Sequence, residues 1–237
     1  MIVGHSLGGN YGYLFVRRQQ QAWKDKYIQS LVTIAAPLGG AGAALHTLAA
    51  GNDKDAAYLE KHASRTLSRT HPVYVYLLPT ANAFGSLPVV QMYDGRNFTA
   101  AEMPEILRVI GDSEGGAMLP PIKKARNSAP PTGVEVHCLR GTGIPTVSGI
   151  RYRSQRDFPF HPEKLWGLGD EQVNQESADV CLQWARGAGQ KARLHAAAFP
   201  GVDHSDIVKN SRVVRYITDL IQRSWRRHDA TVSGQKD

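Results

Sequence analysis

The chain lacks the features that define several protein classes. It has two cysteines, Cys138 and Cys181, in 237 residues, too few for a disulfide-rich scaffold. In a cytosolic protein, two isolated cysteines are more often reduced core residues than a bridge. No run of about 18 consecutive apolar residues occurs, so no transmembrane helix is predicted. The opening residues also lack the charged segment and apolar run of a signal peptide.

The start of the chain is abrupt. Met1 stands only a few residues ahead of a tight, glycine-rich turn, and a folded domain rarely opens in this way. We therefore expect Met1 to be an internal or misassigned start within a longer protein, from which a targeting segment would then be missing.

The basic charge is dispersed. The net charge of +7 is typical of proteins that meet phosphate-bearing partners, either nucleic acids or anionic lipid surfaces. Scattered basic residues indicate a solvated surface, and we expect no nucleic-acid partner. The denser positions are Lys123, Lys124 and Arg126 in mid-chain and Arg223, Arg226 and Arg227 near the end.

Apolar, β-branched segments alternate with segments of helical periodicity, and this pattern predicts a doubly wound parallel sheet. Strands are predicted at 2–3, within 27–36, at 134–139 and at 194–199; helices are predicted at 10–21, 53–60, 100–110, 177–186 and 211–224. Residues 41–128 break the rhythm, and so long an irregular segment predicts an inserted cap. The predicted plan is a core at 1–40 and 129–225, this cap, and a disordered tail at 226–237.

The central motif is Gly4-His5-Ser6-Leu7-Gly8, a match to G-x-S-x-G. In this motif the serine occupies a strained strand-to-helix turn, and the flanking glycines leave room for the neighbouring strand and helix. The turn lifts the hydroxyl to the top of the sheet, so Ser6 is the predicted nucleophile. The N–H of Leu7 would point at the oxyanion that forms. The motif in this context predicts an α/β-hydrolase fold.

A serine nucleophile needs a base, and in this fold the chain order is Ser, then Asp or Glu, then His. His204 follows the strand predicted at 194–199 and precedes the last helix, which is the expected position of the base. The remaining candidates fit less well: His195 begins a strand, His137 lies mid-strand, His228 lies in the tail, and His5 belongs to the turn and is not expected to reach back.

The predicted acid is Asp170, which lies in a glycine-bounded loop ahead of His204. Four other aspartates, Asp157, Asp179, Asp203 and Asp206, are rivals for this role. Asp179 falls inside a predicted helix, and Asp203 adjoins His204 too closely to face its ring easily.

With these residues in place, the sequence resembles the lecithin–cholesterol acyltransferase family, which includes lysosomal phospholipases. The resemblance spans most of residues 2–221. It is carried by Gly4–Gly9, by the segment 21–28, by Ala35-Ala36-Pro37-Leu38-Gly39-Gly40, by Tyr93–Phe98, by 133–139 with 143–146, and by Gly169-Asp170-Glu171-Gln172-Val173-Asn174.

The resemblance implies the same triad, Ser6, Asp170 and His204, with Leu7 as one oxyanion donor. It also implies that Cys138 and Cys181 form a bridge, which would place the protein in an oxidising compartment. This sequence departs from the family where Glu171-Gln172 replaces Gly-Thr and Leu38 replaces Trp. The family's first half, with its early strands, is absent, so the chain alone is expected to be inactive.

The resemblance implies an enzyme that transfers a fatty-acyl group from a glycerophospholipid at a lipid surface to water or to a sterol-like alcohol. No metal and no organic cofactor are expected. The family implies a secreted or lysosomal location, and the sequon at Asn97 predicts glycosylation. Two alternatives remain: a triacylglycerol lipase or esterase, and a truncated, inactive binder of lipid surfaces.

Overall fold

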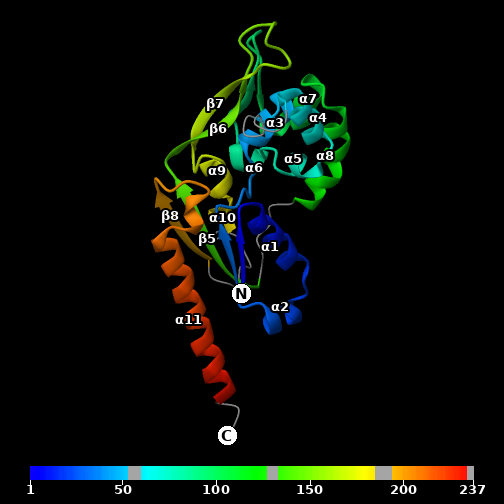
Figure 1. Ribbon diagram of the computed structural model, residues 1–237. Helices are drawn as coiled ribbons and strands as arrows, with labels where there is room; N and C mark the ends of the chain where they lie inside the picture. The colour runs from blue at the N-terminus through cyan, green and yellow to red at the C-terminus, as the bar shows by residue number, and fades with distance from the viewer. Residues whose placement is uncertain (53–59, 127–132, 185–193, 234–237) are drawn as a thin grey trace.

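The protein is described here by a computed structural model, which covers residues 1–52, 60–126, 133–184 and 194–233. Its centre is a four-stranded parallel sheet with the strand order β1-β2-β5-β8 (Figure 1). The strands are β1 (Ile2–His5), β2 (Ser30–Ile34), β5 (Glu135–Thr142) and β8 (Leu194–Pro200). All five residues of β2 are buried, as expected for a parallel strand covered on both faces.

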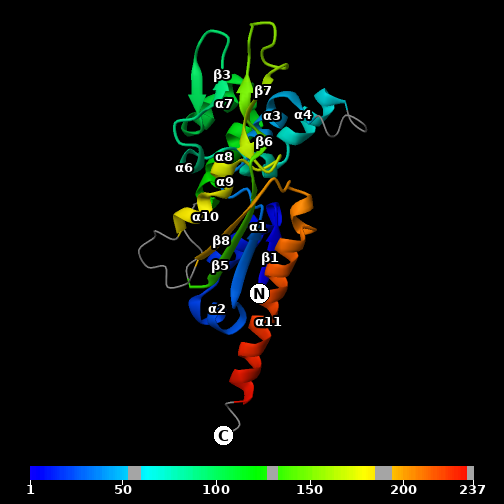
Figure 2. The ribbon, with the colours of Figure 1, turned by 90° about the vertical axis from the view of Figure 1, so that its left-hand side faces the viewer.

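Helices cover both faces of this sheet. On one face, α1 (Leu7–Arg18) and α10 (Val180–Gln183) pack through Tyr13, Val16 and Val180 against Leu31 and Val136. On the other face lies α11 (Ser211–Ser233), whose Val213 and Leu220 join a second core with Val32, Ile34, Leu139 and Phe199. Figure 2 shows α11 running along the sheet and beyond its lower end. The lower end also carries α2 (Gln21–Tyr27), whereas α9 (Gln175–Ala178) lies toward the upper end of the sheet (Figure 1).

A second lobe stands above the carboxyl ends of the parallel strands (Figures 1 and 2). Its sheet has the order β4-β3-β6-β7, from β3 (Pro88–Gln91), β4 (Asn97–Thr99), β6 (Ile144–Arg151) and β7 (Glu163–Gly169). Its helices are α3 (Gly42–Ala50), α4 (Lys61–Arg69), α5 (Pro72–Tyr76), α6 (Ala81–Phe84), α7 (Met103–Val109) and α8 (Ser113–Ala125). Leu45, Leu48, Val90, Ile106 and Ile150 belong to its own buried core.

The alternation of strands and helices predicted for the central sheet is present, but two details differ. Residues 144–169, assigned to the hydrolase core, instead supply β6 and β7 to the second sheet. The last helix continues to Ser233, so residues 226–233 are helical rather than a disordered tail. Most of the helix predicted at 53–60 lies outside the described residues.

Among the described residues, no helix combines the length and the apolar character needed to cross a bilayer.

A disulfide joins the central sheet to the helical face. It links Cys138 on β5 with Cys181 on α10, as the family resemblance implied, and both residues are buried. The bridge closes a loop with a sequence separation of 43 residues. In the chain-entropy model, a loop of this length contributes about 4 kcal/mol by restricting the unfolded chain.

We predict that Cys138→Ser together with Cys181→Ser lowers the free energy of unfolding by about 4 kcal/mol in the chain-entropy model. Urea titration of both proteins measures this difference. Adding reductant should bring the unmodified protein down to the stability of the double variant and leave that variant unchanged. Equal midpoints without reductant would show that the bridge contributes nothing.

Candidate active site

Ser6 sits in a strained turn between β1 and α1. Its φ of 54° and ψ of −129° lie outside the regions that L-residues favour. The turn is fixed on the side of the sheet because the Ser6 N–H donates to the Ile34 carbonyl oxygen at 2.8 Å. The strand-to-helix turn predicted from the sequence is therefore present.

Two glycines allow this turn because atoms of neighbouring residues lie too close to them to admit a Cβ. A Cβ on Gly4 would lie 2.4 Å from the Gly8 carbonyl oxygen, and a Cβ on Gly9 would lie 2.7 Å from the Ala36 Cβ. Gly8 differs, since a Cβ there meets nothing within 4 Å in the described structure. The motif treats Gly4 and Gly8 alike, whereas the packing requires glycine at Gly4 and Gly9.

Leu7 is the first residue of α1. The first N–H groups of a helix have no partner within the helix and carry the positive end of its dipole. Leu7 thus stands where the motif predicts, with its N–H among these groups at the start of α1.

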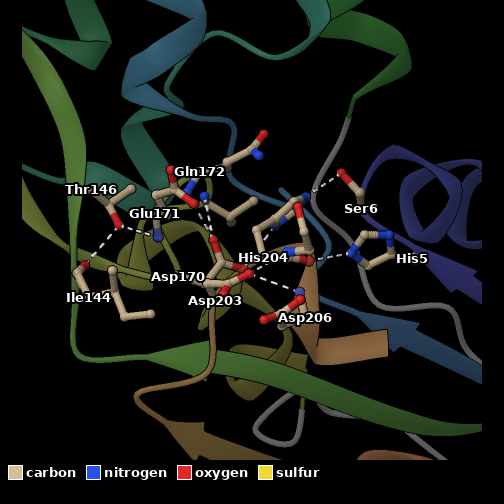
Figure 3. Close-up of polar contacts among 12 residues, drawn as sticks. His5, Ser6, Ile144, Thr146, Asp170, Glu171, Gln172, Asp203, His204 and Asp206 are labelled. Carbon is tan, nitrogen blue, oxygen red and sulfur yellow. Dashed lines mark hydrogen bonds and ion pairs between the residues drawn. The ribbon is translucent and has the colours of Figure 1, made fainter. Parts of the chain in front are cut away.

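His204 lies in the loop that follows β8, and its ring reaches the serine. Its Nε2 lies 2.8 Å from the Ser6 Oγ, and the residue is buried. Two further hydrogen bonds hold its backbone: its N–H donates to the Asp170 carbonyl oxygen at 2.8 Å, and its carbonyl oxygen lies 2.8 Å from the Nε2 of His5 (Figure 3). His5 thus reaches the histidine loop, contrary to the expectation from the sequence.

Asp170 completes the chain of contacts from the end of β7. Its Oδ2 lies 3.0 Å from the Nδ1 of His204, and its Oδ1 accepts from the N–H groups of Val173 at 2.7 Å and Gln172 at 3.1 Å (Figure 3). The carboxylate is 1% exposed, so these contacts replace water. A carboxylate at Nδ1 favours the tautomer whose free Nε2 accepts the serine proton.

Glu171 does not compete for this histidine in the structure. Its side chain is exposed, and its N–H donates to the Thr146 Oγ1 at 2.9 Å. Its φ of 85° is strained for a residue with a Cβ, at the position where the resembled family has glycine. The other rival aspartates bond elsewhere: Asp157 with Ser154, Asp179 with Arg140, Asp203 with the N–H groups of Ser205 and Asp206, and Asp206 with Lys209.

Two buried asparagines brace the site and were missed from the sequence. The Asn174 Oδ1 accepts from the Gly42 N–H and its Nδ2 donates to the Val147 carbonyl oxygen, each at 3.0 Å, so the acid loop is tied to the second lobe. The Asn10 Nδ2 donates to the Pro37 carbonyl oxygen at 3.0 Å and to the Tyr76 hydroxyl at 3.3 Å. Burial raises the pKa of Tyr76. The asparagine four residues after the acid was the one signal for this role that the sequence offered.

A pocket opens above the serine, where the two lobes meet. Its cavity volume is about 320 Å³. Ser6 and His204 line its floor, and residues of α3, α5, β6 and β7 line its walls. Most wall residues are apolar or small, while Lys164 and the exposed Trp166 stand at one side. The pocket is suited to an apolar chain with a polar end, whose reacting group would lie at Ser6.

A serine, a histidine and an aspartate thus meet at the carboxyl edge of a parallel sheet, and the fold is the α/β-hydrolase fold. Among solved structures, a chain of the Tle4–Tli4 complex is similar, with a TM-score of 0.53 and 12% identity over 89% of this chain and 56% of that chain. At this identity the likeness shows the fold alone, and it agrees with the fold predicted from the sequence.

The chain belongs to the lecithin:cholesterol acyltransferase family, whose model matches residues 1–103 and 120–211. It is 32% identical over 222 residues to the "Lysosomal phospholipase A and acyltransferase" of Mus musculus, covering 93% of this chain and 53% of that protein. It is 29% identical over 207 residues to the "Phosphatidylcholine-sterol acyltransferase" of Gallus gallus, covering 87% of this chain and 50% of that protein. The chain spans about half the length of these curated relatives.

We predict that Gly4→Ala and Gly8→Ala differ sharply, although both break the motif. The alanine at Gly4 would collide with backbone, and strain of this kind costs about 1–3 kcal/mol and displaces the serine. The alanine at Gly8 meets open space. For Gly4→Ala, the free energy of unfolding measured by urea titration and the rate of active-site serine labelling should both decrease. For Gly8→Ala, the free energy of unfolding should be unchanged and the labelling rate should stay within about threefold of the unmodified protein. Equal losses in both variants would contradict this account of the turn.

We predict that Asp170→Asn keeps the fold and lowers turnover by about 10⁴-fold, as the equivalent change does in other triads, because the imidazole is then held in the wrong tautomer. Glu171→Gln is the matched control, since it removes the adjacent charge and should leave turnover within a few-fold. Ester hydrolysis by the whole protein measures both. Loss in the glutamine variant with activity kept in the asparagine variant would reassign the acid to Glu171.

Proposed function

We propose that this chain carries the catalytic residues of a serine-dependent phospholipase or lipid acyltransferase. Ser6 is the nucleophile, His204 the general base and Asp170 the acid that orients the base. The observation that carries the proposal is the continuous series of contacts from the Asp170 carboxylate through the His204 ring to the Ser6 hydroxyl, at the floor of the pocket.

In the first half-reaction, the Ser6 Oγ attacks the acyl carbonyl carbon while His204 Nε2 takes the hydroxyl proton. Asp170 stabilises the imidazolium, and the Leu7 N–H donates to the oxyanion. The ester C–O bond then breaks, and His204 gives the proton to the leaving alkoxide, which departs as a lysolipid. The acyl group remains on Ser6 as an ester.

In the second half-reaction, an acceptor hydroxyl loses its proton to His204 and attacks the acyl-Ser6 carbonyl carbon. The bond between the acyl carbon and the Ser6 Oγ then breaks, and His204 returns the proton to that oxygen, which restores the free serine. Water as acceptor gives a free fatty acid, and a sterol-like alcohol gives a new ester. The reaction as written needs neither a metal nor an organic cofactor.

The substrate is inferred from family and pocket together. The names of the relatives describe a phospholipase A with acyltransferase activity and an acyltransferase from phosphatidylcholine to sterol. The mostly apolar pocket above Ser6 suits an acyl chain. We infer a glycerophospholipid presented at a lipid surface as the acyl donor, with residues of the second lobe acting as the cap over it.

The bridge supports a compartment that is oxidising. Disulfides persist in oxidising compartments, which supports a secreted protein or one in the lysosomal or endomembrane lumen. Asn97 is exposed at the start of β4, where a glycan would be accommodated. Its glycosylation remains a prediction.

We predict that a fluorophosphonate probe labels the whole protein at Ser6 and that Ser6→Ala abolishes labelling. Radiolabelled phosphatidylcholine, with and without a sterol, and triacylglycerol should then be compared. Release or transfer of the acyl group from phosphatidylcholine at a rate at least tenfold above triacylglycerol supports the proposal. Preference for triacylglycerol would indicate a lipase. Absence of both labelling and turnover would indicate an inactive lipid-surface binder.

A further inference from the structure

A second cluster of polar side chains lies at the opposite end of the central sheet. Glu135 and His137 lie two residues apart on β5, so they share one face of the sheet, and His195 is the β8 neighbour of His137 in the parallel register. The Glu135 Oε1 lies 3.5 Å from the Nε2 of His137 and 2.9 Å from the Nε2 of His195. One potential ligand atom from each of the three residues lies within 4.8 Å of the other two.

The surroundings orient this cluster. The Nδ1 of His137 lies 2.8 Å from the Tyr216 hydroxyl on α11. When Nδ1 donates to this hydroxyl oxygen, the lone pair of Nε2 is directed at Glu135, which is the arrangement common to metal-bound histidines. The buried Nε2 of His195 has no hydrogen-bond partner among the described residues and only the ion-pair contact with Glu135. Both Nε2 atoms therefore converge on one carboxylate.

We propose that Glu135, His137 and His195 bind a divalent transition-metal ion, of which Zn²⁺ is the representative. Two imidazoles and one carboxylate are a ligand set that zinc accepts, and zinc is commonly four-coordinate. The fourth position faces a cavity of about 320 Å³ lined by Gln29, Tyr216 and Ser224 among others, which admits water. The cluster is separated from Ser6 by the length of the parallel strands and takes no part in the acyl transfer.

The ligand atoms need only a small rearrangement. Zinc binds imidazole nitrogen at about 2.0–2.1 Å, so the nitrogen and oxygen ligands of a tetrahedral site lie about 3.3–3.5 Å apart. The rings of His137 and His195 are stacked, with centroids 4.6 Å apart and an interplanar angle of 10°. Because the two rings are nearly parallel, their Nε2 lone pairs point in similar directions. Both rings must therefore rotate about χ2 toward a shared metal position, and rotation about this torsion costs little energy.

The charged residues around the cluster have opposite effects on the binding of a cation. Glu135 favours a cation, while Arg223 on α11 lines the same cavity and opposes one. Burial, with smaller contributions from His195 and Arg223, lowers the pKa of His137 to about 4.

The test is titration of ZnCl₂ into metal-free protein, followed by isothermal calorimetry and by thermal unfolding. One zinc per chain is expected, with unfolding raised by about 5–10 °C at a hundredfold excess over Kd. His195→Asn and Glu135→Gln should each weaken binding by at least tenfold. Tyr216→Phe should weaken it by about tenfold because the orienting hydroxyl is lost. Arg223→Gln should tighten it.

Two controls separate this site from adventitious binding. His71→Asn removes an exposed histidine elsewhere and should leave the zinc affinity unchanged. His204→Asn tests whether zinc binds the triad instead, and it too should leave the affinity unchanged. The half-exposed His195 tolerates substitution, and circular dichroism of each variant verifies the fold. Unchanged affinity in His195→Asn and Glu135→Gln, or loss of binding in His204→Asn alone, would overturn the proposal.

Discussion

The candidate site depends on close approach between three loops that end three different strands. Ser6 follows β1, Asp170 follows β7 and His204 follows β8, and the contacts among them require these loops to lie within hydrogen-bond distance. Glycines at the strand ends allow this approach because they have no side chain. A Cβ on Gly141, at the end of β5, would lie 2.2 Å from the Val202 carbonyl oxygen and 2.9 Å from the Asp170 Cβ. Gly4 likewise leaves room for the backbone beside Ser6. Close packing at these two glycines therefore sets the distances among the three side chains of the site.

The residues with strained backbone conformations lie at the same end of the molecule as this site. Among the described residues, the non-glycine residues with positive φ are Ser6, Ala35 and Glu171, and each follows the end of a strand there. Such conformations cost on the order of 1–3 kcal/mol each and persist only when the surroundings fix them. Here the fixing contacts are identifiable: Ser6 N–H to Ile34, Ala35 N–H to Leu139 and Glu171 N–H to Thr146. The buried cores on both faces of the central sheet hold β2 and β5, which supply the first two acceptors, and Thr146 lies on β6 of the second sheet.

The sequence predicted what depends on local pattern and chain order. The apolar run around Val32 and Ile34 predicts a strand buried on both faces. The order serine, aspartate, histidine, together with the loop positions of Asp170 and His204, favours the three residues that the structure brings together. The second sheet escaped prediction because β6 contains Pro145 and Gly149 and is irregular between Val147 and Gly149, so it lacks a clean alternation. The role of His5 escaped because its partner is a backbone carbonyl 199 positions away. Tertiary contacts of this kind leave no periodic signal.

Polar residues with a candidate function lie near both ends of the same two strands, β5 and β8. At their carboxyl ends, Gly141 and the loop after Pro200 position His204; at their amino ends, Glu135, His137 and His195 converge. Between the two, the Cys138–Cys181 bridge fixes β5 to α10. The connection from β5 to β8 passes through the second sheet, so their pairing is long-range in sequence and entropically costly to form. A bridge in the middle of β5 and a metal across the amino ends would both restrain this pairing. They would thereby hold the histidine loop against the serine turn without any contact with the substrate.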